Sequence, residues 1–255
     1  MALAFAPKAA FAQDPIGGVE SLRNQVTRAG SPIRLGDRVF QNEVIATGSD
    51  SSARIAFLDQ TNLAIGPTSR VTLDRFVYNA AQQGMAINIS QGAFRFTTGN
   101  INKAGVRINT PTATMGVRGS VVNINVGPNN SSFTLLDESE GVWVCPRRRY
   151  EQDARRPNES EEDYRRRIGC KDLTRPGDTA NVDNRGNITQ SQQSPTQFGL
   201  NGQCSANPTL CGGLQQFAGV PPFANAPFFF LGALLAGGGA IAVINSDNNN
   251  APLSP

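Results

Sequence analysis

Residues 36–79 read GDRVFQNEVIATGSDSSARIAFLDQTNLAIGPTSRVTLDRFVYN, residues 85–99 read MAINISQGAFRFTTG and residues 106–126 read VRINTPTATMGVRGSVVNINV. Apolar and polar residues alternate over short runs here, and Gly, Asp, Asn or Pro closes each run. The apolar residues that share a face are Ile55 with Phe57, Leu63 with Ile65, Val71 with Leu73, Met85 with Ile87 and Ile89, Phe94 with Phe96, and Val122 with Ile124 and Val126. A period of two indicates strands because successive side chains point to opposite faces of a pleated backbone. The stretch from Gly36 to Val126 therefore predicts an all-β domain of short strands.

The residues before this stretch divide into two parts. Residues 13–35 are a polar lead-in, for which we expect one short strand or helical turn. Residues 1–12 read MALAFAPKAAFA, and their end resembles a signal-peptidase site with cleavage after Ala12. Because no basic n-region precedes the apolar run, we interpret residues 1–12 as the last part of a signal peptide that starts upstream. The alternative is an Ala-rich disordered N-terminus.

The strand pattern continues after Val126. Residues 133–136 and 141–144 are predicted to form one hairpin, and residues 180–188 a terminal hairpin around an Asn-Arg-Gly turn. We therefore expect the β domain to span residues 36–190.

A charged insertion, residues 146–169, interrupts this pattern. It contains eight arginines and six acidic residues with few apolar ones. In EEDYRRR, residues 161–167, acids precede arginines at helical spacing, which predicts a short exposed helix. One hypothesis is a docking surface for an anionic partner. The alternative, which we favour because the charges largely cancel, is a solvated, salt-bridged excursion closed by a disulfide.

The four cysteines support export. Cys145 and Cys170 bracket the insertion, and Cys204 and Cys211 bracket a loop that contains Asn and Pro. An even number of cysteines in an exported chain favours disulfides, and proximity favours the pairs 145–170 and 204–211, although four cysteines allow three pairings. A zinc site is the weaker alternative because the chain has no CxxC pair and no histidine.

The C-terminal region changes composition twice. Residues 191–227 are rich in Gln, Ser, Asn, Pro and Gly, which predicts a disordered low-complexity linker. Residues 228–244, FFFLGALLAGGGAIAVI, form an uncharged apolar segment at the short end of the roughly 17–25 residues that span a membrane. Residues 245–255 are a polar tail without the Lys or Arg typical of a cytoplasmic tail. Residues 228–244 are thus a candidate membrane anchor, and the alternative is an exported segment that packs on the domain, a partner or a lipid surface.

Short motifs follow one another in order across residues 36–190. They are Gly36-Asp37, VIATG at 44–48, SSARIAFLD at 51–59, Thr61-x-Leu63, Pro67-x-Ser69-x-Val71, QGAFR at 91–95, Thr110-Pro111-x-Ala113, VRGS at 117–120, Thr134-Leu135-Leu136, GVWV at 141–144, and Leu173 with Pro176-Gly177-Asp178. Their order resembles the FecR-like periplasmic domain of bacterial envelope proteins, with residues 146–169 as an insertion. Gln60 stands where that family usually has Gly, and Ser120 where it usually has Thr.

The resemblance implies a twisted, solenoid-like or sandwich-like stack of short strands. It also implies a role in signalling at the cell envelope through a partner protein. FecR regulators carry a cytoplasmic anti-sigma segment and a transmembrane helix before this domain. Since we expect a signal peptide there instead, the resemblance implies the fold of the periplasmic domain but does not support an anti-sigma role.

The motif Arg118, Gly119 and Ser120 supplies the candidate binding residues. Its glycine permits a bend or a close backbone approach in a strand run, so Arg118 is expected to project from a tight site. One interpretation is a bidentate contact with a carboxylate or a partner. The alternative is an internal pin that ties down strand-end carbonyls or an acid such as Asp37 or Asp59.

The sequence contains none of the usual sets of catalytic residues. It has no histidine, no GxSxG, Walker or GxGxxG motif and no metal-ligand cluster, so we expect no catalytic residues, no metal and no cofactor. A net charge of only +3 disfavours nucleic acid as a partner.

Three functions are compatible with these features. The leading hypothesis is a non-enzymatic binding or signal-relay module that acts through protein–protein contacts in the envelope. The alternative is a structural or surface-displayed envelope protein attached through its C-terminal segment. Glycan binding ranks last because it needs exposed aromatic side chains, and Trp143 and Tyr78 are the only obvious candidates.

Overall fold

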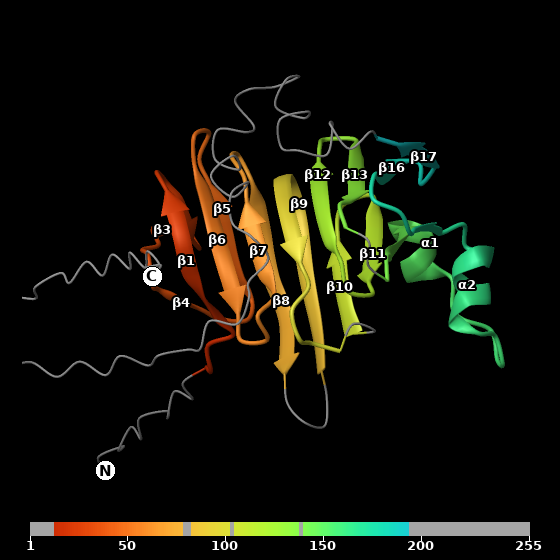
Figure 1. Cartoon of the computed structure of the whole chain (residues 1–255), viewed down its shortest axis with the longest axis horizontal. Helices are drawn as coiled ribbons and strands as arrows, with labels where there is room; N and C mark the ends of the chain where they lie inside the picture. The colour runs from red at the N-terminus through yellow and green to blue at the C-terminus, as the bar shows by residue number, and fades with distance from the viewer. Residues whose placement is uncertain (1–12, 79–82, 103–104, 138–139, 194–255) are drawn as a thin grey trace, which may run out of the picture. The chain divides into compact units, whose positions relative to one another are not determined.

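The computed structural model describes residues 13–78, 83–102, 105–137 and 140–193. Within these ranges 17 strands and two helices follow one another (Figure 1). The strands form one hydrogen-bonded network, which is divided into two layers that we call sheet A and sheet B. The prediction of an all-β fold is confirmed.

Sheet A contains nine strands, and all of its pairings are antiparallel. Their order is β4 (Arg38–Val39), β1 (Gly17–Arg23), β6 (Ser52–Phe57), β7 (Asn62–Ile65), the second half of β9 (Gln83–Thr97), β12 (Val121–Val126), β13 (Asn130–Leu135), β16 (Asp178–Asp183) and β17 (Ile188–Gln192). The hairpin of β16 and β17 is the terminal hairpin that the sequence predicts.

Sheet B also contains nine strands, because it shares β9 with sheet A. Their order is β3 (Ser31–Pro32), β2 (Val26–Arg28), β5 (Glu43–Thr47), β8 (Arg70–Tyr78), the first half of β9, β10 (Val106–Asn109), β11 (Ala113–Val117), β14 (Val142–Pro146) and β15 (Lys171–Leu173). The pairing of β9 with β10 is parallel, and the others in this sheet are antiparallel. The helices α1 (Arg147–Gln152) and α2 (Glu161–Arg167) follow β14.

The chain winds between the two layers. It contributes one or two strands to one sheet, crosses to the other and returns, so from β5 onward each sheet grows in sequence order. This is the solenoid-like stack of short strands that the resemblance implies. It also explains why the predicted hairpin at residues 133–144 does not form. Strand β13 pairs with β12 and β16 in sheet A, whereas β14 pairs with β11 and β15 in sheet B.

Strand β9 crosses from one layer to the other within a single strand. Residues 83–91 pair with β8 in sheet B, and residues 92–97 pair with β12 in sheet A. Gly92 lies at the crossing with φ +106, and a Cβ atom built there would lie 2.0 Å from Ser69 Oγ. Since a side chain at this position would be both strained and in collision with Ser69, the crossing requires glycine.

The core lies between the two sheets. The residues that the two-residue period places on shared faces are buried in one cluster with members from both layers. Phe57 of sheet A stacks on Phe76 of sheet B with ring centroids 5.7 Å apart. The largest fully buried side chains include Phe94, Phe96 and Phe133. The sandwich is therefore held by the faces that the alternation predicts.

Strands already begin in the segment expected to lead into the domain. Residues 17–32 form β1, β2 and β3, and β1 pairs with β6 over most of its length. Val19 and Val26 are buried in the common core. The register of β1 against β6 shifts between Val19 and Ser21, which breaks the two-residue period and hides the strand from a search for alternation.

A second, smaller core forms on the outer side of sheet B. Trp143, Cys145, Tyr164 and Ile168 are buried together there, with Tyr150 packed against them. Figure 1 shows α1 and α2 together at the end of the sheets, near β11. The predicted helix in EEDYRRR is confirmed as α2, and it is exposed except for Tyr164. The insertion contains salt bridges, as the favoured alternative predicts, but it also packs on the outer face of sheet B.

Candidate functional site

The predicted binding residues Arg118, Gly119 and Ser120 form the turn between β11 and β12. Gly119 has φ +107, in the region that favours glycine. Ser120 is buried, its Oγ donates to the Gly141 carbonyl at 3.0 Å and its N–H donates to Thr98 Oγ1 at 3.1 Å. The structure does not bring the three side chains to one surface. Arg118 lines a groove of about 600 Å³, whereas Gly119 and Ser120 line a separate depression of about 270 Å³.

Arg118 extends toward β15. Its Nη2 lies 3.6 Å from Asp172 Oδ1, and both side chains are partly exposed. This aspartate is neither Asp37 nor Asp59, the acids considered for an internal pin. Those two accept hydrogen bonds from residues close to them in the chain instead. An exposed ion pair at this separation contributes little to stability.

The groove that Arg118 lines lies between α2 and the outer face of sheet B, and we call it the Trp143 groove. Its charged and aromatic lining residues are Arg107, Arg118, Glu140, Trp143, Glu161 and Arg165. Ile101 and Val117 add apolar surface. Three arginines and two glutamates therefore face one another around a single indole ring.

The position of Trp143 follows from the register of sheet B. Arg107 of β10 pairs with Gly116 of β11, Gly116 with Trp143 of β14, and Trp143 with Asp172 of β15. Trp143 lies over Gly116, because a Cβ at position 116 would be 2.1 Å from the indole. The ring is thus nearly flush with the backbone of the sheet and only 3 % exposed.

Two arginines from different elements stack on this ring. The guanidinium carbon of Arg107 lies 4.7 Å from the ring centroid, and that of Arg165, from α2, lies 5.2 Å away. Arg107 Nε donates to the hydroxyl of Tyr150 at 3.3 Å, and the Tyr150 ring packs 5.4 Å from that of Trp143. Such cation–π contacts stabilise a guanidinium at a partly desolvated surface.

The electrostatics of the groove reflect this crowding of cations. Burial lowers the pKa of the Arg165 guanidinium, and the positive charges of Arg118 and Arg107 lower it further. Asp172 and Glu161 act in the opposite direction. The groove therefore holds like charges close together with only partial compensation.

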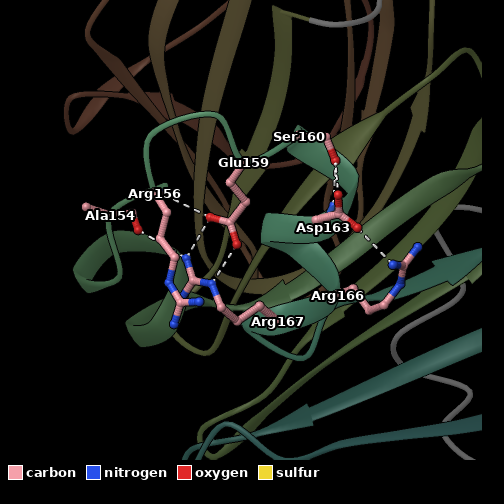
Figure 2. Close-up of polar contacts among 7 residues, drawn as sticks. All are labelled: Ala154, Arg156, Glu159, Ser160, Asp163, Arg166 and Arg167. Carbon is pink, nitrogen blue, oxygen red and sulfur yellow. Dashed lines mark hydrogen bonds and ion pairs between the residues drawn. The ribbon is translucent and has the colours of Figure 1, made fainter.

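Helix α2 holds Arg165 over the sheet and is itself fixed at its N-terminus. Ser160 is the N-cap: its Oγ accepts the Asp163 N–H at 3.1 Å and donates to the Asp163 carboxylate at 2.6 Å (Figure 2). The hydroxyl of Tyr164 donates to the carbonyl of Tyr150 at 3.0 Å. The Cys145–Cys170 disulfide ties the insertion to β14.

Glu159 fixes the loop before α2. Its two carboxylate oxygens accept hydrogen bonds from Arg167 Nε at 2.7 Å and Nη2 at 3.0 Å, and the Arg156 N–H donates to it at 2.9 Å (Figure 2). Arg167 also donates to the carbonyl of Ala154 at 3.1 Å. These bonds, with that from Arg167 foremost, lower the pKa of Glu159 from 4.5 to about 2.

Sequence reasoning did not place Arg107, Trp143 and Arg165 in one site. From the sequence, Trp143 is a candidate only as an exposed aromatic for glycan binding, whereas the structure buries it beneath the two arginines. Tyr78, the other candidate, is 41 % exposed. Among the hypotheses drawn from the sequence, the one that comes closest to this groove is that the insertion is a docking surface for an anionic partner.

The other predicted features have different outcomes. The Cys145–Cys170 disulfide is confirmed, with Cα atoms 4.1 Å apart. Cys204, Cys211, the signal peptide in residues 1–12 and the candidate anchor in residues 228–244 all lie outside the described residues.

In the part of the chain that the structure describes, neither helix is long or apolar enough to cross a membrane.

Similarity to solved structures is low and covers part of the chain. Two crystal structures of a "putative anti-sigma factor" from Parabacteroides distasonis are similar at 12% and 13% sequence identity, each with a TM-score of 0.44. The similarity covers 62% and 63% of this chain and 62% and 64% of those chains, less than two thirds of their length. No curated protein matches the sequence.

The match to a known family lies in the middle of the sandwich. Residues 43–139 match the family described as FecR protein. The match begins at the first residue of β5 and ends shortly after β13, so it includes Arg107 and Arg118 but neither Trp143 nor Arg165. The similarity to the FecR family is therefore confined to residues 43–139, less than half of the chain.

Proposed function

We propose that this protein is a non-enzymatic binding and signal-relay module of the cell envelope that acts through protein–protein contacts. The observation that carries the proposal is the match of residues 43–139 to the FecR family. These residues supply the central strands of both sheets, including the β9 crossing.

The lining of the Trp143 groove supports binding rather than catalysis. None of its lining residues is Ser, Thr, Cys or His, which serve most often as nucleophiles and general bases. Its arginines and its tryptophan belong to the residue types enriched where proteins bind other proteins. A surface of this composition suits recognition of a partner segment.

The disulfide supports a location in the envelope. Cys145 and Cys170 are joined in the folded protein, and such bonds persist mainly in exported proteins. Export also agrees with the interpretation of residues 1–12 as part of a signal peptide. The proposed module therefore acts outside the cytoplasm, and its signal reaches the cell through another protein.

The sheet edges offer a second kind of contact. Among the described residues, β17 pairs only with β16, and β15 pairs only with β14. An edge strand presents backbone N–H and C=O groups that a partner segment can extend by strand addition. Both edges lie at the end of the sandwich where the insertion packs.

The proposal is tested in the native host with the full-length chain. Cross-linking in intact cells should capture one specific protein partner, and deletion of the gene should change transcription of a defined set of genes, restored by complementation. The proposal fails if deletion leaves transcription unchanged and cross-linking yields no specific partner.

The structural alternative is tested by fractionation. If the protein is an envelope component attached through its C-terminal segment, deletion of residues 228–255 should release it from the membrane fraction. Transcription should stay unchanged in that case. For the signal-relay function, loss of the whole chain should change transcription whether or not the segment anchors it.

A further inference from the structure

Arg165 is a half-buried arginine whose hydrogen-bond donors are not used within the described part of the chain. It stacks on Trp143, with its guanidinium carbon 5.2 Å from the ring centroid. Other arginines of the insertion have carboxylates close by. Arg147 Nε lies 2.7 Å from Glu151 Oε1, and Arg167 Nε lies 2.7 Å from Glu159 Oε1. The arginine that faces the groove thus differs from those that stabilise the fold.

The second arginine with spare capacity is Arg118. Its ion pair with Asp172 is long, 3.6 Å, and Asp172 is itself exposed. A guanidinium has five N–H donors in a planar fork that matches the two oxygens of a carboxylate or phosphate. Arg118 and Arg165 therefore offer two forks at one groove, with the Trp143 ring as a rigid floor.

The charge of the groove selects between these anions. Three arginines and two glutamates line it, and Asp172 lies 3.6 Å from Arg118, so the excess positive charge is at most one. A carboxylate, with one negative charge, balances that excess. A phosphate group carries ≈ −1.5 to −2 at pH 7, and Glu140 and Glu161 would repel it.

The size and walls of the groove indicate a peptide. About 600 Å³ exceeds what a lone carboxylate fills. Trp143, Arg165 and the insertion lie outside the residues that match the FecR family, whereas Arg107 and Arg118 lie within them, so the groove combines both parts of the chain.

We propose that the Trp143 groove binds an acidic peptide segment of a partner protein, with Arg165 and Arg118 holding an Asp or Glu carboxylate of that segment. The proposal deepens the protein-binding function and rests on it. It also gives the charged insertion a role in recognition, because α2 carries Arg165 to the face of sheet B and the Cys145–Cys170 bond keeps it there.

The sole tryptophan of the chain is the probe. Full-length protein is titrated at pH 7 with a ten-residue peptide of Asp, Glu, Leu and Gly, and with the same peptide carrying Asn and Gln for Asp and Glu. The acidic peptide should change Trp143 emission saturably, and the amide peptide should not. Added salt should weaken the binding.

Variants locate the contact. Arg165→Gln should weaken binding at least ~10-fold, since a charge-assisted bidentate contact is lost. Arg165→Lys should recover only part of the affinity because an ammonium cannot form the fork. Arg148→Gln removes the same charge from an exposed site in α1 outside the groove and should bind as the wild type does. Circular dichroism checks that each variant is folded.

Several results would overturn the proposal. The first is that neither fluorescence nor calorimetry detects binding of the acidic peptide. The second is that Arg165→Gln and Arg148→Gln lose the same affinity for it. The third is that inorganic phosphate binds more tightly than the acidic peptide. If the peptide fails to bind while cells expressing Arg165→Gln keep the cross-linked partner, the groove assignment is wrong and the protein-binding function stands. If the peptide binds but cross-linking finds no partner in cells, the groove assignment stands and the protein-binding function is wrong.

Discussion

At the residue scale, Glu159 shows how one carboxylate orders the charged insertion. It receives the Arg167 fork and the Arg156 N–H just before α2 begins. Because its pKa is about 2 in the folded protein and 4.5 ordinarily, the folded protein releases this proton near pH 2 and the unfolded chain near 4.5. Between these values the unfolded chain binds more protons, so the stabilisation by Glu159 is complete above 4.5 and is lost as the pH falls toward 2.

The first prediction follows from this pH window. The difference in unfolding free energy between the wild type and Glu159→Gln should be constant from pH 7 to about 5 and shrink toward zero at pH 2. Urea titrations at several pH values, followed by Trp143 emission, measure it. The control is Glu162→Gln, whose carboxylate pairs with Arg166 at the surface of α2, and it should show a smaller difference. A pH-independent difference for Glu159→Gln would contradict the prediction.

Gly92 supports a second prediction at this scale. Gly92→Ala adds a Cβ that meets Ser69 Oγ at 2.0 Å and Ser69 Cα at 2.5 Å, and it retains φ +106. We expect a loss of about 3 kcal/mol or more in the free energy of unfolding. The matched control is Gly30→Ala, with φ +86 and open space around the new Cβ, which should cost only about 1–2 kcal/mol of backbone strain. Equal losses in urea unfolding would show that the crossing of β9 tolerates a side chain.

At the scale of elements, the insertion is a separate unit built on the outer face of sheet B. Its small core uses Trp143 and Cys145 from β14 and Tyr164 and Ile168 from the insertion. Apart from the Arg167–Glu159 pair, the salt bridges of the insertion lie at the surface, where such pairs contribute little. The disulfide and the aromatic packing therefore carry most of the attachment.

The third prediction tests that attachment. The bridge joins residues 25 apart in sequence, and for a loop of this length the chain-entropy model gives about 3 kcal/mol. In a background with Cys204→Ser and Cys211→Ser, reduction should lower the free energy of unfolding by about that amount and shift Trp143 emission to the red as the aromatic cluster loosens. A protein that also lacks Cys145 and Cys170 should not respond to reductant. Unfolding curves that coincide with and without reductant would contradict the prediction.

At the scale of the whole molecule, the groove and edge strands proposed to bind a partner lie at one end of the sandwich. The winding of the chain places β14, β15, β16, β17 and both helices last in both sheets, and the Trp143 groove lies among them. A partner that binds this end would leave the FecR-matching strands β5–β13 as the rigid support.

The fourth prediction concerns the compartment. Protein taken from intact host cells after acid quenching should have Cys145 and Cys170 blocked to alkylation, because the bond forms in an oxidising environment. The same chain starting at residue 13 and made in a reducing cytoplasm should be alkylated at both. Peptide mapping distinguishes these states, and free thiols in the native host would argue against export.

Local patterns in the sequence predict most strands from Gly36 onward, the faces they bury and the helix in residues 161–167, and they favour the Cys145–Cys170 pair. These features depend on local patterns: a two-residue period, acids before arginines at helical spacing, and two cysteines that bracket one insertion. The buried faces follow because a strand can present its apolar side in only one way. For the VRGS motif the sequence predicts a bend or close approach within a strand run, whereas the structure has a turn between β11 and β12, in which Gly119 has φ +107.

The pairing of the strands and the position of the groove depend on tertiary contacts. Alternation marks a strand's face but not its neighbour, so residues 133–144 fit a hairpin pattern equally well although β13 and β14 lie in different sheets. The groove combines Arg107, Trp143 and Arg165 from β10, β14 and α2. No local rule links residues so far apart. Cross-strand register brings β10 and β14 together, and burial of Tyr164 and Ile168 with the disulfide holds α2 on sheet B.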